Sequence, residues 1–300
     1  MTRFIKILIE VFKLSSTPPS IVYPIPLLAL LLFSLSGSRN LLALVFAVAF
    51  TFASQAGINL WNHVNDVEED LIAGKENVLT RYPEIRKYVA VVSFLLYVLA
   101  FLVLVVFSKD KKFAISAFLI VSFVTWIYSD RLVLGKLIPR WKDHYLTEVL
   151  TYLISVPLYT LTVWTIFARI NTRALAVAAF MTPFALSGTF LKDLKDASGD
   201  EKAGLRTLAV VFSPSTLLKI SVFLLWVYYI EVLFLSLIRY IPLESLLALF
   251  TFLGLNYSTI RFVKGGWKIT SEMVGAIKIM IYSNLLSLLL ITLGCLTLLP

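Results

Sequence analysis

Two acidic clusters follow long apolar runs, and their residue types suit metal chemistry. In the first, an asparagine and two aspartates are spaced four residues apart, and in the second, three aspartates lie within eight residues. These spacings place each cluster along one face of a helix, provided that the helix continues through it. The residues of the two clusters are Asn62, Asp66, Asp70, Asp193, Asp196 and Asp200.

Carboxylate and amide oxygens are the hard ligands that Mg²⁺ prefers, and Mg²⁺ keeps coordination positions for substrate phosphates. Paired clusters at one membrane surface could therefore hold a diphosphate through bridging Mg²⁺. A metal that neutralises such a leaving group lowers the barrier to breaking an allylic C–O bond. A solvated helix end explains either cluster alone. Two clusters at apolar helix ends on the same predicted side favour the metal site.

The elements that carry these clusters are predicted to be transmembrane helices. The chain has 300 residues, of which 59% are hydrophobic and only 15% are charged, with a mean hydropathy of +0.88. We expect an all-α polytopic protein whose residues 1–300 form a single membrane-embedded domain with about nine spans. The expected spans are 21–36, 40–62, 88–107, 113–128, 145–168, 174–191, 220–238, 242–258 and 279–299.

Charge predicts the orientation of the spans. Most of the 27 Lys and Arg residues fall at the N-terminus and in four loops, 63–87, 129–144, 192–219 and 259–278. By the positive-inside rule the N-terminus is cytoplasmic, and so is the face with the acidic clusters. The net charge of +9 then reflects topology and partners such as membrane lipid or phosphate, with no nucleic acid expected.

Residues 3–13 form an amphipathic segment ahead of the first span. Phe4, Leu8 and Val11 would lie on one side of a helix, and the charged side chains on the other. Such a helix either lies in the membrane interface or leads directly into the first span.

The acidic stretches resemble the motifs of the UbiA superfamily of intramembrane prenyltransferases. Asn62, Asp66 and Asp70 match its NxxxDxxxD motif, while Asp196 and Asp200, followed by residues 201–208, are similar to its second acidic motif. The resemblance covers nearly the whole chain. It implies helices around a central lipid-accessible cavity, Mg²⁺ at both motifs, a polyprenyl diphosphate donor and a lipophilic or membrane-surface acceptor.

Site residues follow from the motifs and their neighbours. The expected metal ligands are Asn62, Asp66, Asp70, Asp196 and Asp200, of which the four aspartates are also expected to be catalytic. Arg can bind a phosphate through its fork and Lys as a point charge, and Tyr128 and Lys136 lie in a stretch similar to one that the family uses for diphosphate. The expected substrate-binding residues are Asn62, Tyr128, Arg131, Lys136, Lys192, Asp193, Lys202 and Arg206.

The acceptor stays open. Members acting on 4-hydroxybenzoate, and many archaeal lipid-forming members, resemble each other in an Arg-Pro pair after the first motif, where this chain has Glu76-Asn77-Val78-Leu79-Thr80. An aromatic or quinone precursor and a glyceryl phosphate ether both remain possible acceptors.

A membrane cation transporter or channel is the alternative from another functional class. Acidic residues of transporters tend to lie near the bilayer midplane on interrupted helices. Here the acidic residues follow the ends of apolar runs and have basic neighbours, which favours the enzyme.

Overall fold

A computed structural model describes residues 3–17, 20, 22–193, 201–202 and 204–296. Over these residues the regular elements are all helical, which confirms the predicted all-α membrane fold. Eight helices are long and apolar enough to cross a membrane. They are α4 (Leu41–Asn65), η1 with α7 (Pro83–Ile85, Arg86–Phe107), α8 (Lys111–Ser129), α9 (Tyr145–Phe167), α10 (Thr172–Asp193), α13 (Pro214–Leu237), η4 with α14 (Leu243–Thr251, Phe252–Lys264) and α15 (Ser271–Leu296).

The first predicted span is shorter than expected. Helix α3 (Ile25–Ser36) has 12 residues, which corresponds to about 18 Å at 1.5 Å per residue and falls short of the roughly 30 Å hydrocarbon core of a bilayer. Proline confines its start, because Pro24 precedes it and Pro26 lies in its first turn. Gly37, with a positive φ of 69°, ends it. Within the part of the chain that the structure describes, eight helices are thus long enough to span and one apolar helix is shorter.

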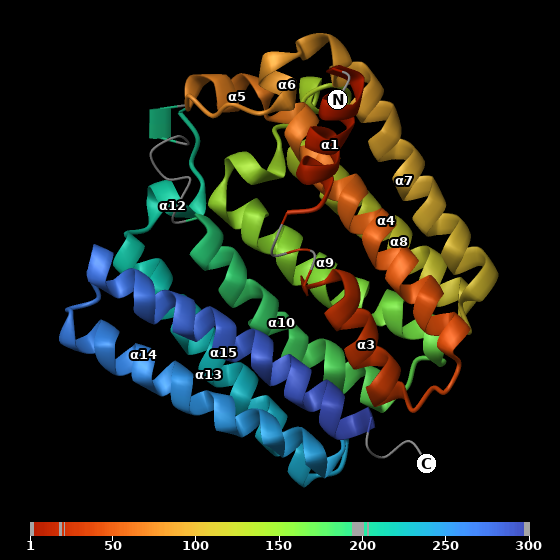
Figure 1. Cartoon of the computed structure of the whole chain (residues 1–300), viewed down its shortest axis with the longest axis vertical. Coiled ribbons are helices and arrows are strands. Elements are labelled where there is room, and N and C mark those ends of the chain that lie inside the picture. Colours follow the sequence, from red (N-terminus) through yellow and green to blue (C-terminus); the bar gives the residue numbers. More distant parts are fainter. Residues whose placement is uncertain (1–2, 18–19, 21, 194–200, 203, 297–300) are drawn as a thin grey trace.

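Close contacts between neighbouring spans hold the bundle together (Figure 1). Helices α4 and α7 meet at Gly57, where the Ser93 hydroxyl donates to the Gly57 carbonyl at 2.7 Å. A Cβ at this position would lie 3.2 Å from both the Ser93 carbonyl and the Tyr97 ring, so a small residue permits the approach. Similarly, Tyr228 of α13 and Ser287 of α15 share a buried hydrogen bond of 2.7 Å.

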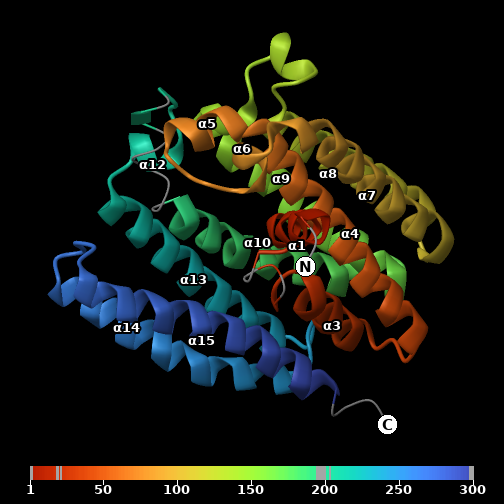
Figure 2. The ribbon, with the colours of Figure 1, turned by 45° about the horizontal axis from the view of Figure 1, so that its top comes forward.

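Three short helices lie at one end of the bundle. Figures 1 and 2 show α5 (Val67–Ile72) and α6 (Val78–Arg81) beyond the end of α4, and α12 (Leu208–Val211) beyond the start of α13. The loop between α8 and α9, which contains η2 (Leu134–Lys136) and η3 (Trp141–Asp143), projects from the same end in Figure 2. This end also carries the first acidic cluster, since α4 passes into α5 there.

Candidate active site

The first acidic cluster lies on a bend between two helices. The backbone N–H of Asp66 donates to the Asn62 carbonyl at 3.0 Å, and that of Asp70 donates to the Asp66 carbonyl at 2.8 Å. Helical hydrogen bonding thus persists on both sides, but α4 ends at Asn65 and α5 begins at Val67, and Figure 1 shows α5 leaving α4 at an angle. The condition under which Asn62, Asp66 and Asp70 would share one helix face, a helix that continues through the cluster, is therefore not met.

Polar side chains around the bend account for the break, because Asn side chains compete with helical backbone hydrogen bonds. The Asn65 amide donates to the Trp61 carbonyl at 2.8 Å, and its oxygen accepts the backbone N–H of Arg131 at 2.8 Å. Asn65 is fully buried, so these bonds fix the end of α4 against the loop that follows α8.

Basic side chains from that loop meet the acidic cluster. Lys142 Nζ lies 2.5 Å from Asp66 Oδ1, and Arg140 Nη1 lies 3.3 Å from the same oxygen. Arg140, whose side chain is only 2% exposed, also pairs with Glu69, and Arg131 binds Glu69 at 2.5 Å. Arg140 also pairs with Asp143 at 2.6 Å, so three cations and three carboxylates lie together at the mouth of the bundle.

The two aspartates of the cluster have opposite electrostatic environments. Burial alone would raise the pKa of the Asp66 carboxyl, but the charges of Lys142 and Arg140 outweigh burial and hold it below its ordinary value. Burial and the negative charge of Asp66 together raise the pKa of Asp70 to about 6. A carboxyl whose pKa is shifted by burial and by a neighbouring carboxylate is a candidate functional group.

The oxygen donors of the first cluster fit Mg²⁺. Asn62 accepts a hydrogen bond from the Ser129 hydroxyl, and Asp70 accepts one from the Asn77 amide at 2.8 Å, so both side chains have fixed orientations. Among the described residues, no three His, Cys, Asp or Glu side chains converge on one metal position. The charges of Lys142 and Arg140 neutralise Asp66 instead. A divalent ion at this cluster would compete with these two cations for the Asp66 oxygen.

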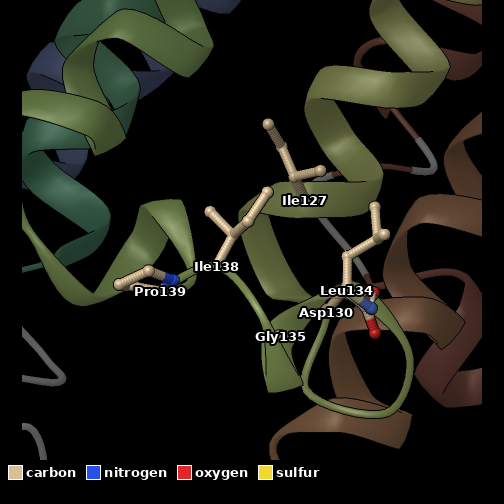
Figure 3. Close-up of a pocket in the computed structure, with 6 residues that line it drawn as sticks. All are labelled: Ile127, Asp130, Leu134, Gly135, Ile138 and Pro139. Carbon is tan, nitrogen blue, oxygen red and sulfur yellow. Dashed lines mark hydrogen bonds between the residues drawn. The ribbon is translucent and has the colours of Figure 1, made fainter.

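A compact turn presents the basic loop (Figure 3). The Asp130 carboxylate accepts backbone N–H groups of Leu132, Val133 and Leu134 at 2.9, 3.0 and 2.7 Å. A Cβ on Gly135 would lie 2.0 Å from the Asp130 carbonyl, so only glycine fits there. The pocket that Ile127, Ile138 and Pro139 line beside this turn is shallow and has no room for a water molecule. Because the loop itself uses the Asp130 carboxylate, we assign this pocket to loop packing.

The second cluster is only partly described. Asp193 is the last residue of α10, and its side chain, with Asp196 and Asp200, lies outside the described residues. Lys192, in the last turn of α10, lies near enough to His63 of α4 for its charge to act on the imidazole. Helices α4 and α10 both pack against α9, and the end of α10, where the second cluster begins, lies at the same end of the bundle as the end of α4 (Figure 1).

The segment after the second cluster is tied to the start of α9. The backbone N–H of Arg206 donates to the Asp143 carbonyl at 3.0 Å, and that of Tyr145 donates to the Arg206 carbonyl at 2.9 Å. Glu148, which is 3% exposed, accepts the Leu208 N–H with one oxygen and the Tyr128 hydroxyl with the other, both at 3.2 Å. One buried carboxylate thus joins α8, α9 and the chain leaving the second cluster.

The structure brings only some of the predicted binding residues together. Asn62, Asp66, Asp70 and Arg131 gather at the first cluster, and Tyr128 lies beside Glu148. Lys136, in contrast, is exposed on the projecting loop, and within the described chain it makes no hydrogen bond or ion pair. Lys202 and Arg206 are exposed on the segment that follows the second cluster.

The sequence interpretation missed Arg140 and Lys142. Both precede the fifth predicted span and lie within a few residues of Lys136. Considering every basic residue of that loop as a phosphate ligand would have included them. Their pairing with Asp66 joins positions 74 and 76 residues apart in the chain, which spacing alone does not reveal.

Comparison with known proteins identifies the family. The model of the UbiA prenyltransferase family matches residues 23–285. The chain belongs to this family. It is also 43% identical, over 95% of its length and 98% of the relative's, to an uncharacterised protein of Archaeoglobus fulgidus.

Solved structures show the same UbiA fold. A digeranylgeranylglyceryl phosphate synthase structure matches with a TM-score of 0.69 at 15% identity, covering 98% of this chain and 100% of that one. A UbiA homologue of Archaeoglobus fulgidus, bound to GPP and Mg²⁺, matches with a TM-score of 0.65 at 16% identity, covering 97% and 99%. The protein is therefore an integral membrane prenyltransferase, and family membership favours the enzyme over the cation transporter or channel.

Proposed function

We propose that this UbiA-family enzyme transfers a prenyl group from an allylic polyprenyl diphosphate to a lipophilic or membrane-surface acceptor. The observation that carries the proposal is the meeting of Asp66 with Lys142 and Arg140 at the end of an apolar bundle. Carboxylates there are suited to a divalent ion and the cations to a diphosphate, while the apolar helices suit a hydrocarbon tail.

Mg²⁺ is the metal that this donor set fits best, since it consists of carboxylate and amide oxygens. Asn62, Asp66 and Asp70 would hold it at the first cluster, and Asp196 and Asp200 at the second. The Mg²⁺ and GPP bound by the Archaeoglobus fulgidus homologue support the same pairing here. When bound, the ion would neutralise charge that builds on the departing diphosphate.

The loop between α8 and α9, which carries Arg131, Arg140 and Lys142, can bind the diphosphate as well as the acidic cluster. Once a divalent ion satisfies Asp66, the Lys142 ammonium and Nη1 of Arg140 are released from that carboxylate and can bind the diphosphate oxygens, while Glu69 and Asp143 still hold the other guanidinium nitrogens. Arg131, Lys192, Lys202 and Arg206 are further candidates for phosphate contacts.

The reaction then follows from charge balance. The allylic C–O bond of the donor breaks, and the diphosphate leaves with the electron pair. A carbon or oxygen nucleophile of the acceptor forms the new bond to the allylic carbon and loses a proton. Cations around the diphosphate favour the bond-breaking step, since negative charge increases there.

Two acceptor classes fit the chain: an aromatic or quinone precursor, and a glyceryl phosphate ether. The segment from Glu76 to Thr80 lacks the Arg-Pro pair of hydroxybenzoate-type and many archaeal lipid-forming members. The fold match to the digeranylgeranylglyceryl phosphate synthase makes the ether a necessary test compound.

The test is a product screen with purified protein in lipid nanodiscs. The protein is incubated with dimethylallyl, geranyl or geranylgeranyl diphosphate and one acceptor of each class, in buffer that contains Mg²⁺. The products are identified by mass spectrometry. We expect a prenylated acceptor and stoichiometric diphosphate release, both abolished by EDTA.

Matched variants separate metal binding from folding. Asp66→Ala and Asp196→Ala should each lower turnover at least about 100-fold in protein that still folds, although Asp66→Ala also lowers thermal stability because Lys142 and Arg140 lose this partner. Glu68→Gln, next to the cluster but exposed and paired with Arg86, should retain turnover. Wild-type rates in Asp66→Ala, or Mg²⁺-independent ion flux in liposomes without diphosphate release, would contradict the proposal.

A further inference from the structure

The N-terminal helix α1 (Arg3–Ser15) exposes an apolar face. Phe4, Leu8 and Phe12 are 67%, 51% and 55% exposed, and Ile5 and Ile9 beside them are also exposed. These positions lie on one side of a helix. Large side chains exposed in such a continuous stripe indicate contact with a partner.

A different face of α1 packs against the protein. Ile7, Val11 and Leu14 contact a small core cluster that includes Leu60 and Leu79. The helix is therefore held in place by apolar contacts on one face, and its second apolar face is left outside.

The orientation of α1 shows that it does not lead directly into a span. It ends at Ser15, ahead of α3, and crosses α4: in Figure 2 α1 is seen nearly end-on, whereas α4 runs across the view. The Phe12 ring lies 6.2 Å from that of Phe52 on α4, and the Asn59 amide donates to the Ser15 carbonyl at 2.9 Å. The exposed face of α1 thus lies beside the half-buried Phe52 of a spanning helix.

Two lysines of α1 lie next to the exposed apolar stripe. Lys6 and Lys13 are exposed on a third face, between the exposed apolar stripe and the packed side. A helix with an apolar face and adjacent lysines is typical of segments in the membrane interface, where lysines meet anionic headgroups.

We propose that α1 lies in the membrane interface on the side of the first acidic cluster, with Phe4, Leu8 and Phe12 among lipid chains and Lys6 and Lys13 at anionic headgroups. Glu10 on the same helix binds Arg81 at 2.5 Å. Arg81 ends α6, which begins after Asn77, the residue whose amide binds Asp70. From the lipid side, α1 thus braces the segment that orients Asp70. This placement does not depend on the substrate.

Spin-label accessibility tests the placement, and the single Cys295 makes the labelling simple. In a Cys295→Ser background, Leu8→Cys and, as the matched control on the basic face, Lys13→Cys are labelled in nanodiscs that contain phosphatidylglycerol. We expect the label at position 8 to collide more with oxygen than with a water-soluble nickel chelate, and the label at position 13 to show the reverse. The depth at position 8 should decrease in pure phosphatidylcholine.

Each other outcome overturns part of the proposal. Greater collision with the nickel chelate at position 8 would place that face in water. Protection from both reagents would show that protein covers it, as a second copy of the chain would. Equal depth in both lipids, or a lipid response unchanged in Lys6→Gln/Lys13→Gln, would exclude the headgroup contact. None of these readouts depends on turnover, so they are independent of the proposed reaction.

Discussion

At the scale of single residues, Asp66 and Lys142 form the pair whose role depends most on the ligands present. They lie 2.5 Å apart, and the same ammonium lies 3.2 Å from Glu69. A cation held by two carboxylates costs energy to displace. A divalent ion together with a diphosphate could offset this cost, because each of the separated partners then gains a new one.

The sequence favours Lys136 as a phosphate ligand, whereas the structure favours Lys142. We expect Lys142→Gln to raise the donor KM about tenfold, since the side chain reaches the cluster, whereas Lys136→Gln should change it less, since that side chain is exposed on the loop. Initial rates over a range of donor concentrations check this. The reverse order would restore Lys136 as the principal phosphate ligand.

Asp70 makes the stability of the metal-free protein depend on pH. Its folded pKa of about 6 exceeds the ordinary value of 3.8, so the folded state binds the proton more tightly. Stability should therefore increase as pH falls from about 6 towards 4. Melting in EDTA should show this gain in the wild type and a smaller one in Asp70→Asn. An identical pH response in the two proteins would contradict the raised pKa.

At the residue scale, the sequence was enough to predict only part of the site. Asn62, Asp66 and Asp70 were recognisable because their motif is contiguous. Arg140 and Lys142 reach the cluster through the fold of a loop, and that fold depends on Asp130 and Gly135, whose roles appear only in three dimensions. Asp196 and Asp200 stay predictions, as they lie outside the described residues.

At the scale of elements, the start of α9 connects both halves of the site. The loop before it carries Arg140 and Lys142 to the first cluster, while its first turns hold the segment that leaves the second. Sequence predicted this helix well, at 145–168 against Tyr145–Phe167, because a long apolar run is a strong signal. The bend at Asp66 was not predicted, because periodicity assumes that a helix continues.

Glu148 is the positioning residue of this junction. Both of its oxygens accept hydrogen bonds, so an amide at this position must turn its oxygen to the Leu208 N–H and its NH2 group to the Tyr128 hydroxyl, which then has to accept instead of donate. We expect Glu148→Gln to reduce turnover about tenfold and to raise the Mg²⁺ concentration needed for half-maximal rate. Glu148→Ala should reduce both turnover and thermal stability further.

Glu272, an exposed carboxylate in the first turn of α15, supplies the control, and Glu272→Gln should behave as wild type. If Glu148→Gln lowered thermal stability but left the Mg²⁺ dependence unchanged, Glu148 would be structural only.

At the scale of the whole molecule, composition alone was enough to predict a bundle of membrane helices. It did not reveal that α3 begins only at Ile25, after Pro24, since the apolar residues around Pro24 read as one run with it. The inward orientation of the N-terminus and of the acidic face stays a prediction from charge. So does the central cavity, which the family resemblance implies.

The central claim is that both acidic clusters hold one diphosphate through Mg²⁺. The most direct measurement is the equilibrium binding of a thio-linked geranyl diphosphate analogue, which resists C–S cleavage, to the protein in nanodiscs. We predict binding in Mg²⁺ that is lost in EDTA and at least about tenfold weaker in both Asp66→Asn and Asp196→Asn. Equally tight binding in EDTA, or unchanged binding in either variant, would contradict the account.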